Sequence, residues 1–289
     1  MIPPLGLLLD VDGPISSPIE RRIAIPSIIT DLVTLAGLGV PIAFITGRSD
    51  TFMRAEVVEP LIEAGLPGDA RMFGVSEKGA VWFTITPDGI GAMEIDRDLA
   101  LPEDYTTEFR DIAQSRFDDT MFFDDTKYAM VSVEQHRDVD HAEFLFAQEQ
   151  VNQVAFDLLV EYGLGARYRD QEFPDAQGLV NYRVDPTIIS TDVESVLLDK
   201  DRGAARALEY FRTLGELPTL WRTLGDSRSD YLMADYLHSQ GFDVAHVDVR
   251  PTDGILERPY RIITEGDLIH DEAGAAFLRH WVHTLGSTV

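Results

Sequence analysis

Short apolar runs alternate with a helical repeat at the start of the chain. The runs LGLLLD (residues 5–10) and VPIAFIT (residues 40–46) are bounded by turn residues, as buried parallel strands usually are. Between them, residues 27–39 have helical spacing of apolar positions and end on a glycine. The pattern predicts a β-α-β unit, which a helix over residues 50–64 and a strand near residues 71–75 continue.

The middle of the chain has a different pattern. A Thr-Pro-Asp-Gly turn (residues 86–89) between alternating strands indicates a hairpin within residues 80–96. Residues 141–164 have the repeat of a long amphipathic helix. From about residue 193 the first pattern returns, with expected helices over 203–214, 229–238 and 272–285 and expected strands over 219–225 and 242–249.

These two patterns predict the fold class and the domains. We expect an α/β protein in which residues 1–84 and 193–289 form a Rossmann-like three-layer core with a parallel sheet. Residues 85–192 then form an α+β domain inserted into that core. With 289 residues, 45% of them apolar, the chain can bury one large core or two smaller ones.

Composition narrows the location and the chemistry. The sequence has no apolar run of about 18 residues, and its N-terminus lacks the basic flank and apolar core of a signal peptide, so we expect a cytoplasmic protein. The absence of cysteine excludes disulfides, thiolate metal sites and a cysteine nucleophile. No G-x-G-x-x-G after a strand, P-loop, H-E-x-x-H or G-x-S-x-G motif is present.

The charge balance is strongly acidic. Fifty acidic and 24 basic residues give a formal net charge of −26. Such a surface repels nucleic acid and anionic membranes, so we expect neither as a partner. A small phosphorylated substrate would need an electropositive pocket in this acidic protein, and a bound divalent cation would provide it locally.

Two carboxylates follow the first apolar run. Asp10 and Asp12 are two residues apart, so along an extended backbone both point to the same side. They lie at the carboxyl end of a strand, where open α/β sheets bind ligands, and Gly13 permits a sharp turn there. A solvated Asp-Gly turn explains the pair equally well. An EF-hand does not, because its glycine and glutamate positions are not filled.

Later strand ends and helix starts carry further polar residues. Thr46 and Gly47 leave the second strand with a hydroxyl and a backbone N–H that can hold a phosphate oxygen. GDSRSD (residues 225–230) leaves a later strand, and KDRG (residues 200–203) opens a helix. Helix caps, turn residues and solvated charges explain each of these singly.

Taken together and in this order, the motifs resemble those of the haloacid dehalogenase superfamily of phosphohydrolases. The motifs are DVDG (residues 10–13), Thr46, Lys200 or Arg202, and GDSRSD (residues 225–230). An insert between the second and third motifs is what members with a C2-type cap have. The resemblance therefore implies a phosphatase core with a C2-type cap.

The resemblance also implies roles, which the chemistry of phosphoryl transfer supports. Asp10 would attack phosphorus to form an aspartyl-phosphate, and Asp12 would act as general acid and then general base. The expected Mg²⁺ site combines the carboxylates of Asp10 and Asp226 with the Asp12 carbonyl, and Asp230 orients the motif.

The basic residue of the third motif has two candidates. In relatives this motif usually has a lysine directly before a glycine. The position before the glycine is Arg202 here, which favours Arg202, whereas the residue type favours Lys200. Lys78 lies in EKGA (residues 77–80), where many capped relatives have an Asn-Gly-Ala turn. With Gly47, Arg48 and the cap residue Arg183, it is a candidate for phosphate or substrate binding, although structural roles are as good an explanation for Arg48 and Arg183.

The expected function is Mg²⁺-dependent hydrolysis of a small phosphorylated metabolite. Capped relatives commonly act on sugar phosphates or sugar-derived molecules, which sets the expected substrate class. Two alternatives stay open: a phosphomutase, which returns the phosphoryl group to substrate, and a regulatory protein on an inactive enzyme fold. The sequence predicts neither the substrate nor the oligomeric state.

Overall fold

The computed structural model describes residues 3–287, which form two compact units. Met1–Glu94 and Asp199–Val289 make up one, here called the core unit, and Ile95–Leu198 make up the other, the inserted unit. No helix of the described chain is both long and apolar enough to cross a membrane.

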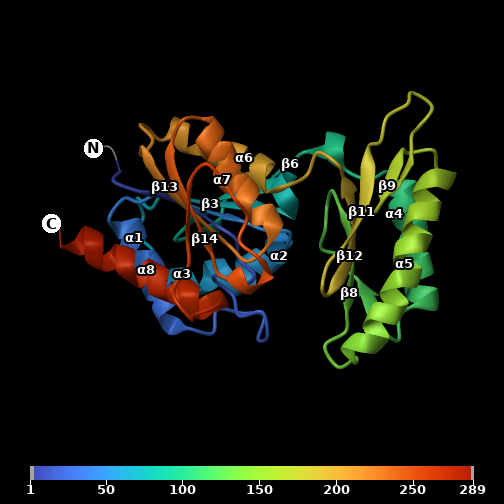
Figure 1. Cartoon of the computed structure of the whole chain (residues 1–289), viewed down its shortest axis with the longest axis horizontal. Coiled ribbons are helices and arrows are strands. Elements are labelled where there is room, and N and C mark those ends of the chain that lie inside the picture. The colour runs from blue at the N-terminus through green and yellow to red at the C-terminus, as the bar shows by residue number, and fades with distance from the viewer. Residues whose placement is uncertain (1–2, 288–289) are drawn as a thin grey trace. The chain divides into compact units, whose positions relative to one another are not determined.

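The core unit is built on a mainly parallel sheet with the strand order β15-β14-β13-β1-β2-β3-β4-β5, and β6 also pairs with β4 (Figure 1). The strands from β15 to β3 are parallel, whereas β4 runs antiparallel to β3. The strands are β1 (Gly6–Leu9), β2 (Ile42–Ile45), β3 (Met72–Ser76), β4 (Val81–Thr86), β5 (Gly89–Ile90), β6 (Glu94–Ile95), β13 (Leu220–Gly225), β14 (Asp243–Asp248) and β15 (Arg261–Ile263).

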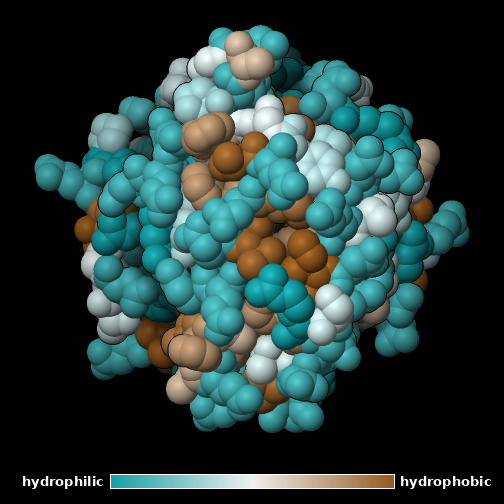
Figure 2. Space-filling model, turned by 90° about the vertical axis from the view of Figure 1, so that its right-hand side faces the viewer, coloured by the Kyte–Doolittle hydropathy of each residue, from teal (hydrophilic) through white to brown (hydrophobic). Residues whose placement is uncertain are grey.

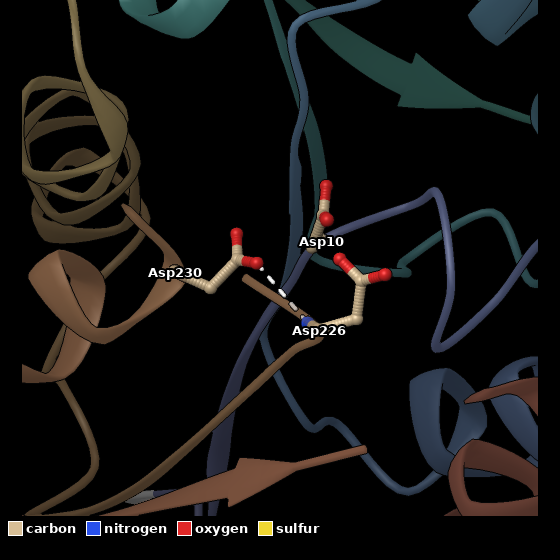
Figure 3. Close-up of side chains that lie close together, drawn as sticks. All are labelled: Asp10, Asp226 and Asp230. Carbon is tan, nitrogen blue, oxygen red and sulfur yellow. Dashed lines mark hydrogen bonds between the residues drawn. The ribbon is translucent and has the colours of Figure 1, made fainter. Parts of the chain in front are cut away.

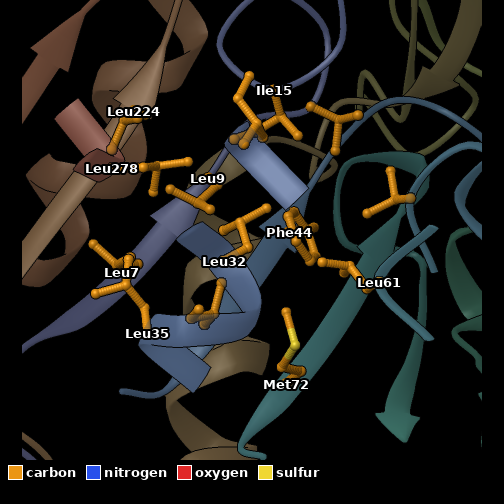
Figure 4. Packing of buried hydrophobic residues seen from close by; sticks show 14 of the residues in the cluster. Leu7, Leu9, Ile15, Leu32, Leu35, Phe44, Leu61, Met72, Leu224 and Leu278 are labelled. Carbon is orange, nitrogen blue, oxygen red and sulfur yellow. The ribbon is translucent and has the colours of Figure 1, made fainter. Parts of the chain in front are cut away.

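Helices cover both faces of this sheet because its central strands are apolar on both sides. In β1, Leu7 and Leu9 point into one cluster and Leu8 into another. The first cluster packs against α1 (Pro26–Gly37), α3 (Glu59–Glu63) and α8 (His270–Gly286), as Figure 4 shows for part of it. The second packs against α6 (Lys200–Thr213) and α7 (Tyr231–Ser239). The three-layer α/β core predicted from the sequence is confirmed.

One predicted helix is interrupted. Residues 50–64 form α2 (Asp50–Met53), a wider π-turn (Arg54–Val58) and then α3. Pro60 has no N–H to donate to the carbonyl four residues earlier, so a regular α-helical bond cannot form there.

The inserted unit is an α+β unit with the strand order β10-β9-β11-β12-β8-β7. Its helices, α4 (Glu103–Arg116) and α5 (His141–Glu161), pack on one face of the sheet. The Asp140 carboxylate caps α5 by accepting hydrogen bonds from the backbone N–H groups of Ala142 and Glu143. The strands are β7 (Met121–Phe123), β8 (Val131–Gln135), β9 (Ala166–Tyr168), β10 (Gln171–Phe173), β11 (Tyr182–Pro186) and β12 (Ser190–Ser195).

The other face of this sheet is polar. Val131, Val133, Val184 and Val193 point toward the helices, so the alternate residues of β8, β11 and β12 point the opposite way. We call this side the polar face. Its residues are Ser132, Glu134, Arg183, Asp185, Ser190, Asp192 and Glu194.

The outer side of α4 and α5 is mostly hydrophilic. Figure 2 looks onto the side where these helices lie in Figure 1 and shows a few hydrophobic groups near the middle of a hydrophilic surface. Leu145 and Phe146 are among the exposed hydrophobic residues of α5. The acidic composition of the chain is consistent with such a surface.

Along the sequence, the boundaries between the two units lie after Glu94 and Leu198, later than the expected limits at residues 84 and 192. Strand β4 pairs with β3, so it extends the core sheet beyond the expected limit. Strand β12 pairs with β8 and β11 and therefore completes the inserted sheet. The sequence patterns on either side of these strands do not reveal which sheet each strand joins.

Candidate active site

Residues from several strands of the core unit meet at the carboxyl edge of its sheet. Asp10 follows β1, and Asp226 follows β13, which is paired with β1. Asp230 ends the short 3-10 turn Arg228–Asp230. One carboxylate oxygen from each of these three residues lies within 4.8 Å of the others, and Figure 3 shows the three side chains close together. We call this group the acidic cluster.

The ammonium group of Lys200 binds two of the three carboxylates. Its Nζ lies 2.6 Å from Oδ1 of Asp10 and 2.7 Å from Oδ1 of Asp230. It also donates a hydrogen bond of 2.8 Å to the Ile45 carbonyl at the end of β2. Lys200 is the first residue of α6, where the Asp199 carboxylate accepts a bond from its backbone N–H. The ammonium is thus held by two ion pairs and one hydrogen bond to a carbonyl.

Burial and charge shift the pKa values of these groups in different directions. Burial raises the pKa of Asp10 well above its ordinary value, and the charge of Asp230 adds to this, while Lys200 opposes it. Burial disfavours the charged form of Lys200, but the carboxylates of Asp10 and Asp230 outweigh it and raise the Lys200 pKa. Burial also acts to raise the pKa of Asp230, yet Lys200 and the hydrogen bonds from Ser227 lower it overall. Lys200 and Asp230 therefore form a stable ion pair, whereas the charge of Asp10 is costly to bury.

Asp230 also fixes the loop that carries Asp226. Its Oδ2 accepts hydrogen bonds from the backbone N–H groups of Asp226 (3.1 Å, dashed in Figure 3) and Ser227 (2.9 Å) and from the Ser227 hydroxyl (2.7 Å). Gly225 makes room for it, because a Cβ there would lie 2.0 Å from the Asp230 Cβ. The loop geometry thus requires a glycine at position 225, because any side chain there would clash with Asp230.

Two basic residues that the sequence analysis missed lie beside Asp226. Arg250 Nη1 is 3.5 Å and His270 Nδ1 is 3.9 Å from Asp226 Oδ2. Burial, helped by the charge of Asp230, raises the pKa of Asp226 to about 6, and Arg250 opposes the shift. Arg250 follows closely after β14, so the rule that drew attention to the other strand ends also indicates it. His270, at the start of α8, has no comparable sequence signal.

Asp12 points to a different partner. Arg48 Nε donates to both oxygens of the Asp12 carboxylate, at 3.2 Å to Oδ1 and 3.1 Å to Oδ2, and Arg48 Nη2 donates to Oδ1 at 3.0 Å. Gly13 follows with a φ of 97°, and a Cβ at that position would lie 2.8 Å from the Asp226 Cγ. The turn after Asp12 therefore requires glycine both for its conformation and for the placement of Asp226.

The other candidates near the end of β2 lie against the turn after β3. The carbonyl of Thr46, a fully buried residue, accepts a hydrogen bond of 3.0 Å from the Lys78 N–H. Lys78 has a φ of 52°, and its Cε would be 3.6 Å from a Cβ at Gly47, so its side chain reaches over that glycine. The stem of Arg202 lies against Gly79, where an added Cβ would be 3.0 Å from the Arg202 Cγ. Lys200, and not the stem of Arg202, is thus directed toward Asp10.

Arg183 lies within the inserted unit, on the polar face. Its Nε and Nη2 donate to Oε1 of Glu194 at 2.9 and 2.7 Å, and Nη2 also donates to the Leu198 carbonyl at 2.8 Å. Glu194 is opposite Arg183 in the register of β11 and β12. No sequence pattern indicates this cross-strand ion pair.

The acidic cluster fits a divalent cation. Carboxylate oxygens are ligands that Mg²⁺ prefers, and Asp10 and Asp226 follow adjacent parallel strands. Oδ2 of Asp230 already accepts three hydrogen bonds, and its Oδ1 contacts Lys200. Asp230 is therefore better suited to orienting the loop than to direct metal binding.

Comparison with solved structures shows which proteins share this fold. No protein-family model matches the chain, and no curated protein matches its sequence. Among solved structures, the C-terminal domain of C. albicans trehalose-6-phosphate phosphatase matches with a TM-score of 0.63 and 14% identity, over 99% of this chain and 94% of that one. A haloacid dehalogenase-like hydrolase from Bacteroides thetaiotaomicron matches with a TM-score of 0.58 and 12% identity, over 96% and 98%.

The Aspergillus fumigatus trehalose-6-phosphate phosphatase gives a TM-score of 0.53 at 15% identity, over 99% of this chain and 93% of that one. These matches cover nearly the whole chain, including the inserted unit. At such low identity the likeness concerns the fold. The chain therefore has the haloacid dehalogenase-like fold that its four motifs predicted.

Proposed function

We propose that the protein is a Mg²⁺-dependent phosphatase that hydrolyses a small phosphorylated metabolite, a sugar phosphate, through an aspartyl-phosphate on Asp10. The observation that carries the proposal is the contact of Asp10 with the Lys200 ammonium at 2.6 Å, inside a cluster of carboxylates at the carboxyl edge of the sheet. A carboxylate nucleophile, a fixed positive charge and further oxygen ligands are what phosphoryl transfer requires.

In the first step, an oxygen of Asp10 forms a bond to phosphorus, and the bond from phosphorus to the leaving oxygen breaks. Asp12 gives its proton to that oxygen, so the product leaves as an alcohol. Lys200 contacts Asp10 and offsets the negative charge that gathers there. When bound, a divalent cation would neutralise the clustered carboxylates and the phosphoryl oxygens.

In the second step, water attacks the phosphorus of the aspartyl-phosphate and Asp12 takes its proton. Inorganic phosphate leaves and the Asp10 carboxylate is regenerated, which returns the protein to its starting state. Thr46, Gly47 and Lys78 are the proposed phosphate-binding residues, since the Lys78 side chain reaches over Gly47.

The polar face of the inserted unit carries groups that suit a sugar. Ser132 and Ser190 donate hydrogen bonds to the Asp192 Oδ1 at 2.7 and 3.1 Å, which leaves this carboxylate fixed in place. Carboxylates and hydroxyls suit the many hydroxyl groups of a sugar, and an acidic face disfavours an anionic leaving group. Trehalose-6-phosphate phosphatases among the similar structures are consistent with this class.

A phosphate-release screen tests the proposal. The protein is incubated with a panel of sugar monophosphates and with non-sugar monophosphates, with Mg²⁺ or with excess chelator. We expect phosphate release from sugar phosphates, only with the metal. The Asp10→Asn variant should be inactive, while Asp88→Asn, in the exposed turn between β4 and β5, should match the wild type. Conversion of a sugar phosphate to an isomer without phosphate release would instead indicate a mutase, and no turnover of any substrate would refute the proposal.

A further inference from the structure

The Asp12 carboxylate is held by Arg48 on both of its oxygens. Oδ1 accepts from Nε at 3.2 Å and from Nη2 at 3.0 Å, whereas Oδ2 accepts only from Nε, at 3.1 Å. A planar guanidinium that reaches both oxygens fixes the plane of the carboxylate as well as its position. Oδ1 is thus the more firmly held atom, and Oδ2 retains more of its capacity for another hydrogen bond.

Arg48 is itself held rigidly. Its backbone N–H donates to the Thr46 hydroxyl at 3.1 Å, and its carbonyl accepts from the Glu77 N–H at 3.1 Å. Its guanidinium lies 4.8 Å from the centre of the Phe52 ring. Only 14% of the Arg48 side chain is exposed, compared with 36% of the Asp12 side chain. The arginine is therefore the fixed partner, and the aspartate is the one that faces solvent.

The turn after Asp12 fixes the backbone of the aspartate too. The Ser16 carbonyl accepts a hydrogen bond of 3.0 Å from the Gly13 N–H, and the Val11 carbonyl accepts one of 2.7 Å from the Ser16 N–H. With both backbones anchored, the orientation of the Asp12 carboxylate is set by its contact with Arg48.

We propose that Arg48 is a positioning residue that acts through Asp12, rather than a residue that binds the phosphoryl group. The inference rests on the proposed function, since it concerns how the acid of that reaction is oriented. Arg48 holds Oδ1 and so directs Oδ2, the less occupied oxygen, to exchange the proton with the leaving oxygen. The bonds made and broken are those of the first step above.

Two esters with the same phosphoryl group and different leaving groups test this. Nitrophenolate leaves without protonation, whereas an alkoxide needs a proton, so only the alkyl ester depends on a well-placed acid. Single-turnover release of the leaving group is measured for 4-nitrophenyl phosphate and for a sugar phosphate that the wild type hydrolyses. Arg48→Gln removes the pairing, and Arg48→Lys keeps the charge without the bidentate geometry.

We expect both variants to slow release from the sugar phosphate by about 100-fold, and from 4-nitrophenyl phosphate by only a few fold. The affinity for inorganic phosphate, measured by product inhibition, should stay at the wild-type value. In an Asp12→Asn background, Arg48→Gln should add no further loss. Arg54→Gln is the matched control, because the Arg54 side chain is 49% exposed and pairs with Asp50 at 3.9 Å.

Other results would overturn the inference. Equal losses for both esters, together with weaker phosphate binding, would mean that Arg48 contacts the phosphoryl group. Unchanged rates for both esters would make the pair purely structural. If the wild type hydrolyses neither ester, the proposed function fails and this inference fails with it. Thermal unfolding of each variant separates a loss of function from a loss of fold.

Discussion

The acidic cluster of the core unit and the polar face of the inserted unit use the same kinds of residue in different ways. In the core unit, Asp10 and Asp230 lie after adjacent parallel strands, and Lys200 reaches both carboxylates from the start of α6. On the polar face, Arg183 and Glu194 are direct neighbours in the register of adjacent antiparallel strands. The first arrangement concentrates charge at one point, whereas the second pairs charges across neighbouring strands.

This difference suggests a division of tasks. Concentrated charge with a raised Asp10 pKa is costly, and such cost is typical of reacting groups. Polar groups with hydrogen-bond partners are less costly to bury, and carboxylates and hydroxyls suit the recognition of many hydroxyls. Changes in the acidic cluster should therefore affect the rate for every substrate, and changes on the polar face should affect the choice among substrates.

The largest expected effect is the loss of the nucleophile. Asp10→Asn should lower turnover by more than about 10⁴-fold for all phosphate monoesters, because an amide cannot form the aspartyl-phosphate. Steady-state phosphate release measures this, with Asp88→Asn as the control. Substantial turnover by the variant would mean that the reaction does not pass through Asp10.

Alanine substitutions should show whether Lys200 or Arg202 is the basic residue required for turnover. Lys200→Ala should reduce turnover by about 100-fold or more. It should also lower the free energy of unfolding by about 3–5 kcal/mol, because two buried carboxylates lose their counter-charge. Arg202→Ala, made in parallel, should change turnover little. The reverse order of effects would assign the motif to Arg202, and near-normal turnover in both variants would make Lys78 the next candidate.

The raised pKa of Asp226 gives a pH test of the acidic cluster. The folded-state pKa of about 6 lies above the ordinary value of 3.8, so the folded protein binds the proton more tightly than the unfolded chain does. Without metal, the contribution of Asp226 to stability should therefore fall as the pH rises from about 4 to 6 and then level off. Asp226→Asn should be the more stable protein by about 2 kcal/mol at pH 7, with no advantage below pH 4.

Chemical denaturation at a series of pH values, in the presence of chelator, checks this sign. Saturating Mg²⁺ should stabilise the wild type and not the variant, because the ion binds only where the carboxylate is present. The stated cause would be contradicted if the stability difference between Asp226→Asn and the wild type did not shift in favour of the variant from pH 4 to pH 7.

The smallest of these effects is expected on the polar face. Asp192→Asn should raise the KM for the best sugar phosphate by about 10-fold, the size of one hydrogen bond to a charged group. The rate with 4-nitrophenyl phosphate, which offers no sugar hydroxyls, should stay within about twofold. Asp111→Asn, an exposed residue of α4, is the control in the same unit. Equal losses with both substrates would remove the distinction between the two regions.

The sequence predicted the convergence of Asp10 and Asp226 because it depends only on strand order and direction. Where a residue lies relative to a strand end can be inferred from apolar runs, and parallel strands bring their ends together. The choice between Lys200 and Arg202 could not be predicted, because it depends on which side of α6 faces Asp10. That direction is set by the first turn of the helix, which Asp199 caps.

The pairing of side chains in the candidate site is the feature that the sequence predicts least well. The pairing of Asp12 with Arg48 requires the turn after β1 and the turn after β2 to approach each other, and no sequence pattern encodes that distance. The same holds for Arg250 and His270 beside Asp226. The sequence pattern puts the limits of the inserted unit too early for a related reason, since tertiary packing decides which sheet β4 and β12 join.

The Lys200 ammonium has a mechanical consequence. Its three contacts, with Asp10, Asp230 and the Ile45 carbonyl, tie together the ends of β1 and β2 and the loop after β13. If the first turn of α6 unwinds, all three attachments are released at once. We therefore expect local opening of this edge to be cooperative, so that the amide hydrogens of these separate segments exchange with solvent in a single event.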